Sequence, residues 1–320
     1  MSVDTIFKVA LHPFVNESIA SLKSMTSLEG SAGEPFMDEV DQFRFKGYAV
    51  CSDMKGSLDG VVLMHHYSET AVAIGNEVCS YMLGETFAHE EVNEELSKAL
   101  SEWGNTIVGR ATDFLSKHNL GFDFSAPYCA MTLEDMDKYL VGVKQIVTVP
   151  IFIEGVGRYY FNLLVRDVKY DAEAKGAPAA ETRQAPTVAI ENTHQTRLSF
   201  ESTILLVDDS SLIRKAIRRF LNELGYGTII EASDGTEAVE IVAEQAIDFV
   251  FMDVVMDQMN GDEALAKIRQ IKPELPVVML SSVTDYEMVA TCKELGISGF
   301  IFKPLNKDNG PEMLQRHLKV

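Results

Sequence analysis

The sequence is poor in cysteine and in positive charge, and it contains no long apolar run. Its four cysteines, Cys51, Cys79, Cys129 and Cys292, form no CxxC pair, which argues against a zinc site or a disulfide framework. Lys and Arg total 28 against 48 Asp and Glu, and the net charge of -20 would repel a nucleic-acid backbone. No uncharged apolar run reaches roughly 18 residues, and the N-terminus lacks a signal-peptide pattern. We therefore expect a cytoplasmic protein that binds neither nucleic acid nor membrane.

A change in composition divides the chain. From Asp171 to Ser202 the sequence is rich in Ala, Pro, Glu and Thr, and it has no apolar period that could form a buried face. At 320 residues the chain is also long for one compact domain. We expect a flexible linker over 171–202 between an N-terminal domain, 1–170, and a C-terminal domain, 203–320.

The C-terminal region alternates short apolar runs with helical patterns. Five such runs, among them TILLV and FVFM, are each followed by a segment of helical periodicity. This alternation predicts an α/β fold with a five-stranded, doubly wound parallel sheet of the flavodoxin-like kind. In that architecture, the residues just past the carboxyl ends of the strands meet in one crevice.

Polar residues stand at the ends of these runs. Asp208 and Asp209 follow ILLV, Asp253 follows FVFM, Ser281 follows VVML, and Lys303 follows FIF. Three neighbouring carboxylates need a cation, and their hard oxygen ligands favour magnesium. Together with Lys303, such an ion would neutralise an incoming phosphoryl group and leave Asp253, on the middle run, as the nucleophile. The crevice predicts phosphoryl transfer to an aspartate.

This set of residues resembles the receiver domain of two-component response regulators, from about Thr203 to the C-terminus. The resemblance implies a phosphorelay in which a histidine kinase, CheA-like, donates the phosphate. The roles it implies are phosphorylation at Asp253, contacts to the phosphoryl group from Ser281 and Lys303, a switch aromatic at Phe300, and Mg²⁺ held by Asp208, Asp209, Asp253 and the backbone carbonyl of Val255.

Two features depart from the usual receiver pattern. Asp257 stands after Met256 where receivers usually have proline, and it adds negative charge. Val255 and Val283 lie two residues beyond the predicted nucleophile and the predicted hydroxyl, and neither side chain can orient a water molecule. We therefore expect slow self-dephosphorylation and a need for a separate phosphatase.

The N-terminal region contains a long helical pattern over 90–117. Glu102 and Asn105 lie three residues apart on the face opposite the apolar stripe, where we expect both to be exposed. The residues predicted to form the apolar stripe are Val92, Leu96, Leu100, Trp103, Ile107, Ala111 and Phe114.

The surroundings of Glu102 and Asn105 are similar to the CheX branch of the CheC/CheX phosphatases, over about residues 7–170. Asn105 is followed, after a gap of 21 residues, by Pro127 in SAPYCAM. The resemblance implies an α+β domain in which Glu102 reaches the lysine of a CheY-like receiver. Asn105 would orient water against the aspartyl phosphate, since an amide can both accept and donate hydrogen bonds.

Two neighbouring features bear on this assignment. A second ExxN pair, Glu90 and Asn93, has no proline at the corresponding distance. Lys98 stands where the family often has Asp or Ser, and a cation there is expected to compete for Glu102.

The adjacent His65 and His66 lie in a predicted strand and face opposite sides, so they cannot chelate one metal ion together.

Two functions remain open from the sequence. The first is a chemotaxis signalling protein whose N-terminal domain hydrolyses aspartyl phosphate on a CheY-like receiver, either in trans or in cis. The second is a phosphorylation-gated adaptor without hydrolytic activity, whose N-terminal domain forms a homodimer and binds partners. A DNA-binding regulator is disfavoured because no helix-turn-helix with basic residues accompanies the receiver.

Overall fold

The computed structural model describes residues 10–38, 40, 43–56, 58–117, 122–125, 127–130, 132–168, 198–256, 258–281 and 291–318. Asp257 and Val283 lie outside the described residues, as does most of the linker predicted over 171–202. Within that segment, residues 198–202 are described. Leu198 is buried, and its backbone N–H donates to the Leu318 carbonyl over 3.1 Å.

The N-terminal region is built on an eight-stranded antiparallel sheet with the order β1-β7-β8-β4-β3-β5, in which β2 also pairs with β7 and β6 with β3. Long ladders join β3, β4, β8 and β7 at its centre. This arrangement confirms the predicted α+β fold. The strands are β1 (Gly30–Ala32), β2 (Phe36–Asp38), β3 (Gly47–Gly56), β4 (Leu58–Tyr67), β5 (Phe122–Phe124), β6 (Tyr128–Ala130), β7 (Gln145–Ile153) and β8 (Gly157–Val168).

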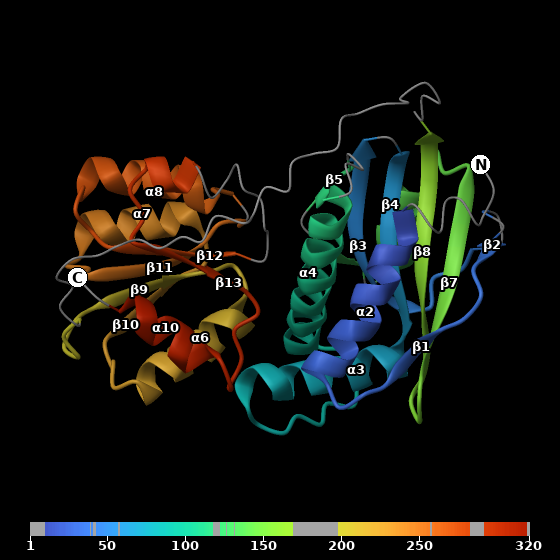
Figure 1. Cartoon of the computed structure of the whole chain (residues 1–320), viewed down its shortest axis with the longest axis horizontal. Coiled ribbons are helices and arrows are strands. Elements are labelled where there is room, and N and C mark those ends of the chain that lie inside the picture. The colour runs from blue at the N-terminus through green and yellow to red at the C-terminus, as the bar shows by residue number, and fades with distance from the viewer. Residues whose placement is uncertain are drawn as a thin grey trace.

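Three helices, α2 (His12–Met25), α3 (Ser68–Leu83) and α4 (Glu94–Lys117), pack together beside this sheet (Figure 1). On the other side Met136 of α5 (Leu133–Leu140) is buried. The two adjacent histidines of β4 confirm that the sheet separates two apolar layers. The His65 ring lies 5.3 Å from the Phe43 ring, whereas the His66 ring lies 4.7 Å from the Tyr159 ring and 5.9 Å from that of Trp103.

The apolar stripe predicted for the long helix forms the buried face of α4 except at its two ends. Val92 is half-buried and lies before the helix, which begins at Glu94. Phe114 is 46% exposed, and Leu115 is buried instead. At 100° per residue Phe114 returns to the direction of Leu96, so helical spacing alone does not predict its exposure near the end of α4. The predicted stripe residues that are fully buried are Leu96, Leu100, Trp103, Ile107 and Ala111.

The C-terminal region is a five-stranded sheet with the order β10-β9-β11-β12-β13, and all its pairs are parallel. All five residues of β11 are buried, as expected for a central strand covered on both faces. The elements are β9 (Ile204–Val207), α6 (Ser211–Glu223), β10 (Ile229–Ala232), α7 (Gly235–Glu244), β11 (Phe249–Asp253), α8 (Gly261–Ile271), β12 (Val277–Ser281), β13 (Gly299–Phe302) and α10 (Gly310–His317). This topology confirms the predicted doubly wound fold.

The two regions contact each other through α3 and α4 on one side and α6 on the other. Figure 1 shows α4 on the side of the N-terminal sheet that faces the C-terminal region. The buried apolar side chains around α4 and those beneath α6 form one continuous cluster. None of the helices in the described part of the chain is long and apolar enough to cross a bilayer.

Candidate functional site

The carboxyl ends of the parallel strands bring the predicted acidic residues together. Asp208 follows β9 and is fully buried, Asp253 ends β11 and is 7% exposed, and Asp209 is exposed. One carboxylate oxygen from each of the three lies within 4.8 Å of the other two. Hard oxygen ligands at this spacing are typical of a Mg²⁺ site, in which each carboxylate supplies a donor.

Lys303, directly after β13, bridges two of these acids. Its Nζ lies 2.7 Å from an oxygen of Asp208 and 2.7 Å from an oxygen of Asp253. Burial alone lowers the pKa of Lys303, but the charges of Asp208 and Asp253 outweigh it and hold that pKa well above its usual value. Burial raises the pKa of Asp253 to about 8, even though the positive charge of Lys303 lowers it. The crevice therefore holds more buried negative charge than one lysine offsets, which fits a site for a cation.

Ser281 and the loop after Asp253 complete the crevice. Ser281 ends β12 and is buried, and its carbonyl accepts a hydrogen bond of 2.8 Å from the backbone N–H of Lys303. Val255 is half-buried in the loop that follows Asp253. This loop closes tightly, because a Cβ at Gly261 would lie 2.0 Å from the Asp253 carbonyl oxygen. The position accepts only glycine without movement of the loop.

The predicted switch aromatic, Phe300, lies on β13 next to this crevice. Its ring is partly buried against the apolar cluster of the C-terminal region and is 5.0 Å from the ring of Phe302. Phe302 itself is 47% exposed. The structure therefore places Phe300 on an inward-facing position of the same strand that leads to Lys303.

Glu102 of α4 lies beside this crevice, although it belongs to the N-terminal region. Its side chain is only 9% exposed, so the expectation of an exposed Glu102 is wrong. The reason is the C-terminal region itself, which covers this face of α4. Burial raises the pKa of Glu102 to about 7, the positive charge of Lys303 lowers it, and the negative charges of Asp208 and Asp209 raise it. The carboxylate of Glu102 is thus within electrostatic range of the acidic crevice.

Asn105 is half-buried and lies one turn further along α4. A hydrogen bond from its side chain to Glu102 lowers the pKa of that carboxyl group, after the larger effects of burial and of the receiver charges. The amide and the carboxylate therefore act as neighbours on the helix face that the C-terminal region covers.

The second ExxN pair has a structural role. The side-chain oxygen of Asn93 accepts a hydrogen bond of 2.9 Å from the backbone N–H of Leu96, which makes Asn93 the cap of α4. The helix consequently begins at Glu94, four residues later than the predicted start at Glu90. Glu90 itself is exposed and lies before the helix.

Lys98 is engaged away from Glu102. Its Nζ lies 2.8 Å from a carboxylate oxygen of Glu94, and it donates a hydrogen bond of 2.9 Å to the hydroxyl of Ser211, at the start of α6. The expected competition of Lys98 for Glu102 is therefore replaced by a contact with the C-terminal region.

The polar residues that join the two regions were not predicted from the sequence. Glu95 of α4 pairs with Lys215 of α6 over 2.8 Å, and Asn306 donates to the Tyr81 hydroxyl over 2.5 Å. Arg219 of α6 donates to the Leu83 carbonyl. One signal was available: RKAIRR, residues 214–219, is a dense basic segment in a chain of net charge -20.

Comparison with known proteins matches two family models to separate parts of the chain. A family model described as the response regulator receiver domain matches residues 204–315, and one described as the chemotaxis phosphatase CheX matches residues 48–151. The chain is 35% identical over 115 residues to the chemotaxis protein CheY of Bacillus subtilis (strain 168), an alignment that covers 36% of this chain and 96% of that protein.

Two solved structures are also similar to parts of the chain. CheX from Desulfovibrio desulfuricans is 16% identical, with 49% of this chain and 99% of that chain covered and a TM-score of 0.39. A chain of the CheX-CheY-BeF3-Mg+2 complex from Borrelia burgdorferi is 29% identical, with 36% and 87% covered and a TM-score of 0.34.

A five-stranded parallel sheet with three carboxylates and a lysine at its strand ends defines a receiver-type domain. The chain belongs to the response regulator receiver family through its C-terminal domain, and a CheX domain precedes that receiver.

Proposed function

We propose that the protein is a chemotaxis response regulator that carries its own phosphatase: Asp253 accepts a phosphoryl group from a histidine kinase, and the CheX domain hydrolyses it in cis. The observation that carries the proposal is the buried position of Glu102, whose pKa, raised mainly by burial, responds to Lys303, Asp208 and Asp209 of the same chain. A phosphatase domain that acted only on other proteins would not need its helix face packed against its own receiver.

Phosphorylation requires a nucleophile and compensating charge. An oxygen of Asp253 attacks the phosphorus of the donor, and the bond from phosphorus to the donor's leaving group breaks. Lys303, which lies 2.7 Å from Asp253, pairs with the transferred phosphoryl oxygens, and the Ser281 hydroxyl donates to one of them. Asp208, Asp209, Asp253 and the Val255 carbonyl would hold Mg²⁺, which supplies further positive charge for the phosphoryl oxygens when bound.

Hydrolysis requires a positioned water molecule. The water oxygen bonds to phosphorus as the bond between phosphorus and the Asp253 oxygen breaks, and the water proton leaves with inorganic phosphate. The amide of Asn105 accepts a hydrogen bond from that water and donates one to a phosphoryl oxygen, which makes Asn105 the catalytic residue of the CheX domain. Glu102 is a positioning residue, because its carboxylate attracts Lys303 and orients Asn105.

The test is the lifetime of the phosphorylated full-length chain. The protein is loaded with a small phosphodonor and Mg²⁺, the donor is removed, and phosphate release is followed. Asn105→Ala should slow the release by about 10²–10³-fold, the usual effect of removing one preorganised hydrogen-bonding group. Glu102→Ala should slow it as well, by weakening the approach of α4 to Lys303.

The matched control is Glu90→Ala, which removes the exposed acid of the other ExxN pair and should leave the lifetime unchanged. Circular dichroism would establish that each variant remains folded. If Asn105→Ala and the unmodified chain lose phosphate at the same rate, the CheX domain is not a phosphatase for this receiver, and the non-catalytic adaptor becomes the better description.

A further inference from the structure

A set of polar contacts joins the two domains through residues that take no part in the proposed chemistry. On the CheX domain they come from the end of α3 and the first turns of α4. On the receiver they come from α6 and from the loop before α10. We call the CheX side of this contact the docking face. Its members are Tyr81, the carbonyl of Leu83, Glu85, Glu95 and Lys98.

The receiver offers the docking face two cations from α6, Lys215 and Arg219. Of the four basic residues in RKAIRR, Arg214 and Arg218 both pair with Glu231 on β10, over 3.0 and 2.5 Å. Lys215 points to the CheX domain instead, and Arg219 contacts that domain while its Nε also lies 2.9 Å from Glu223 on its own helix. Lys215 lies 2.8 Å from Glu95, and Arg219 donates to the Leu83 carbonyl and lies 3.4 Å from Glu85.

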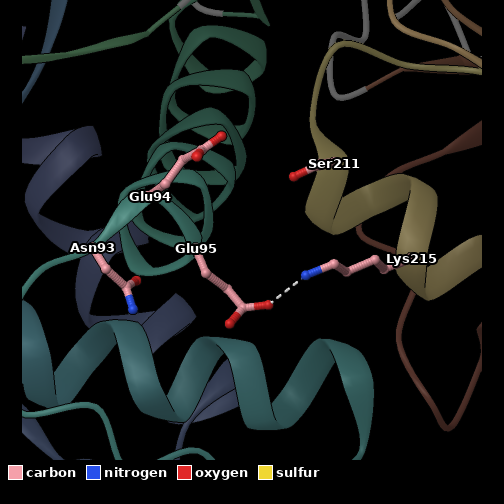
Figure 2. Close-up of a pocket in the computed structure, with 5 residues that line it drawn as sticks. All are labelled: Asn93, Glu94, Glu95, Ser211 and Lys215. Carbon is pink, nitrogen blue, oxygen red and sulfur yellow. Dashed lines mark hydrogen bonds and ion pairs between the residues drawn. The ribbon is translucent and has the colours of Figure 1, made fainter.

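The docking face is organised to receive these cations. Figure 2 shows Glu95 directed across the pocket to Lys215, with Glu94 and Ser211 on the two facing helices. A second oxygen of Glu95 lies 3.2 Å from a ring nitrogen of His89, which fixes the carboxylate from behind. One turn after Glu95, the docking face carries a cation in place of an acid. This residue, Lys98, donates a hydrogen bond to the hydroxyl of Ser211. The face therefore combines acids for Lys215 and Arg219 with a donor for a hydroxyl acceptor.

We propose that the docking face selects receivers by their first helix, and that the receiver of this same chain occupies it and excludes others. The partner it fits is a receiver with Lys and Arg four residues apart on that helix, at the positions of Lys215 and Arg219, and a hydroxyl at the position of Ser211. Exposed ion pairs are individually weak, so several must act together, and covalent linkage in one chain strengthens their combined effect.

This inference rests on the proposed phosphatase function, because its main measurement is the release of phosphate. The measurement combines two full-length variants, a substrate chain and a catalyst chain. The substrate chain carries Asn105→Ala, which keeps its phosphate, and Glu85→Lys with Glu95→Lys, which release its receiver while α6 stays intact. The catalyst chain carries Asp253→Asn, so it cannot be phosphorylated. It is prepared with and without Lys215→Ala and Arg219→Ala, which free its docking face without creating acids that could pair with the substrate chain's substituted positions 85 and 95.

The freed catalyst should release phosphate from the substrate chain at least about tenfold faster than the catalyst whose own receiver remains docked. A tenfold difference in rate is equivalent to roughly 1.4 kcal/mol. A control catalyst with Lys267→Ala and Lys293→Ala makes the same charge change at exposed positions near α8 and should behave as the docked form. Equal rates for the docked and freed catalysts would overturn the proposed exclusion.

Selection by the first helix is tested by adding Lys215→Ala and Arg219→Ala to the substrate chain, because alanine, unlike glutamate, cannot pair with its substituted positions 85 and 95 and dock the receiver again. Its phosphate should then resist the freed catalyst, and full sensitivity would overturn the proposed selection. If no catalyst releases phosphate at all, the phosphatase function fails separately. Calorimetric binding between the freed catalyst and the substrate chain then decides the docking proposal: binding that the α6 substitutions in the substrate chain abolish supports it, and absence of binding refutes it.

Discussion

Asp253 combines three properties that a phosphorylation site needs. It ends a strand whose other four residues are fully buried, it lies 2.7 Å from Lys303, and it shares its surroundings with two further carboxylates. These properties follow from strand order and residue type, so the sequence was sufficient to predict them. The carboxyl ends of neighbouring parallel strands must converge, whatever the loops between them do.

Asp253→Asn should abolish phosphorylation by small phosphodonors, because the amide keeps the shape of the side chain and lacks the nucleophilic oxygen anion. The fold should persist, since removing one of several crowded carboxylates relieves repulsion within the crevice. The measurement is the mass increase of the intact protein after incubation with the donor and Mg²⁺. Acyl phosphate on another carboxylate of the variant, such as Asp209 or Asp257, would show that the nucleophile is misassigned.

At the scale of single elements, α4 illustrates what periodicity can and cannot predict. The inner face was predicted from spacing because apolar residues every three or four positions must meet the same core. The first residue of the helix and the burial of its outer face were not predicted. The start depends on one hydrogen bond from Asn93, and the outer face is covered by a domain more than 100 residues further along the chain. A periodic pattern identifies the apolar face of a helix but contains no information about a polar partner.

Asn93→Ala should lower the free energy of unfolding by about 1 kcal/mol, because the first turn of α4 loses its side-chain cap. Chemical denaturation followed by circular dichroism measures this loss. Glu90→Ala makes a change of similar size at an exposed position before the helix and should stay within about 0.5 kcal/mol of the unmodified protein. Equal stability of the two variants would mean that Asn93 does not cap α4.

For the molecule as a whole, the two buried histidines of β4 should limit stability in acid. Burial lowers the pKa values of His65 and His66 to about 3, and the ring nitrogens of His66 have no hydrogen-bond partner among the described residues. In the unfolded chain a histidine has a pKa near 6.5, so below that pH the unfolded state binds more protons. Each histidine should then cost about 1.4 kcal/mol of stability per pH unit between about pH 6.5 and 3.

His66→Phe isolates this effect, since the ring lies among Tyr48, Trp103 and Tyr159 and a phenyl ring does not titrate. Urea denaturation at pH 7.5 and 5.5 should show a smaller loss of stability in the variant, by about 1.4 kcal/mol. Asp253 and Glu102 have pKa values that are raised mainly by burial, so their protonation increases the stability of the folded protein as the pH falls. Because both proteins share this effect, the difference between them reports His66 alone. Parallel losses in the two proteins would mean that His66 becomes protonated without unfolding.

The placement of Glu102 beside Lys303 in one polypeptide has a consequence for the kinetics of the proposed signal. Every phosphorylated molecule carries one copy of the group that would remove its phosphate, so decay would be first order and its half-life would not depend on how much protein a cell makes. A separate phosphatase would instead produce a lifetime that varies with the ratio of two expression levels. The covalent arrangement would thus give the signal a fixed duration, and dilution of the purified phosphoprotein over a hundredfold range should leave its half-life unchanged.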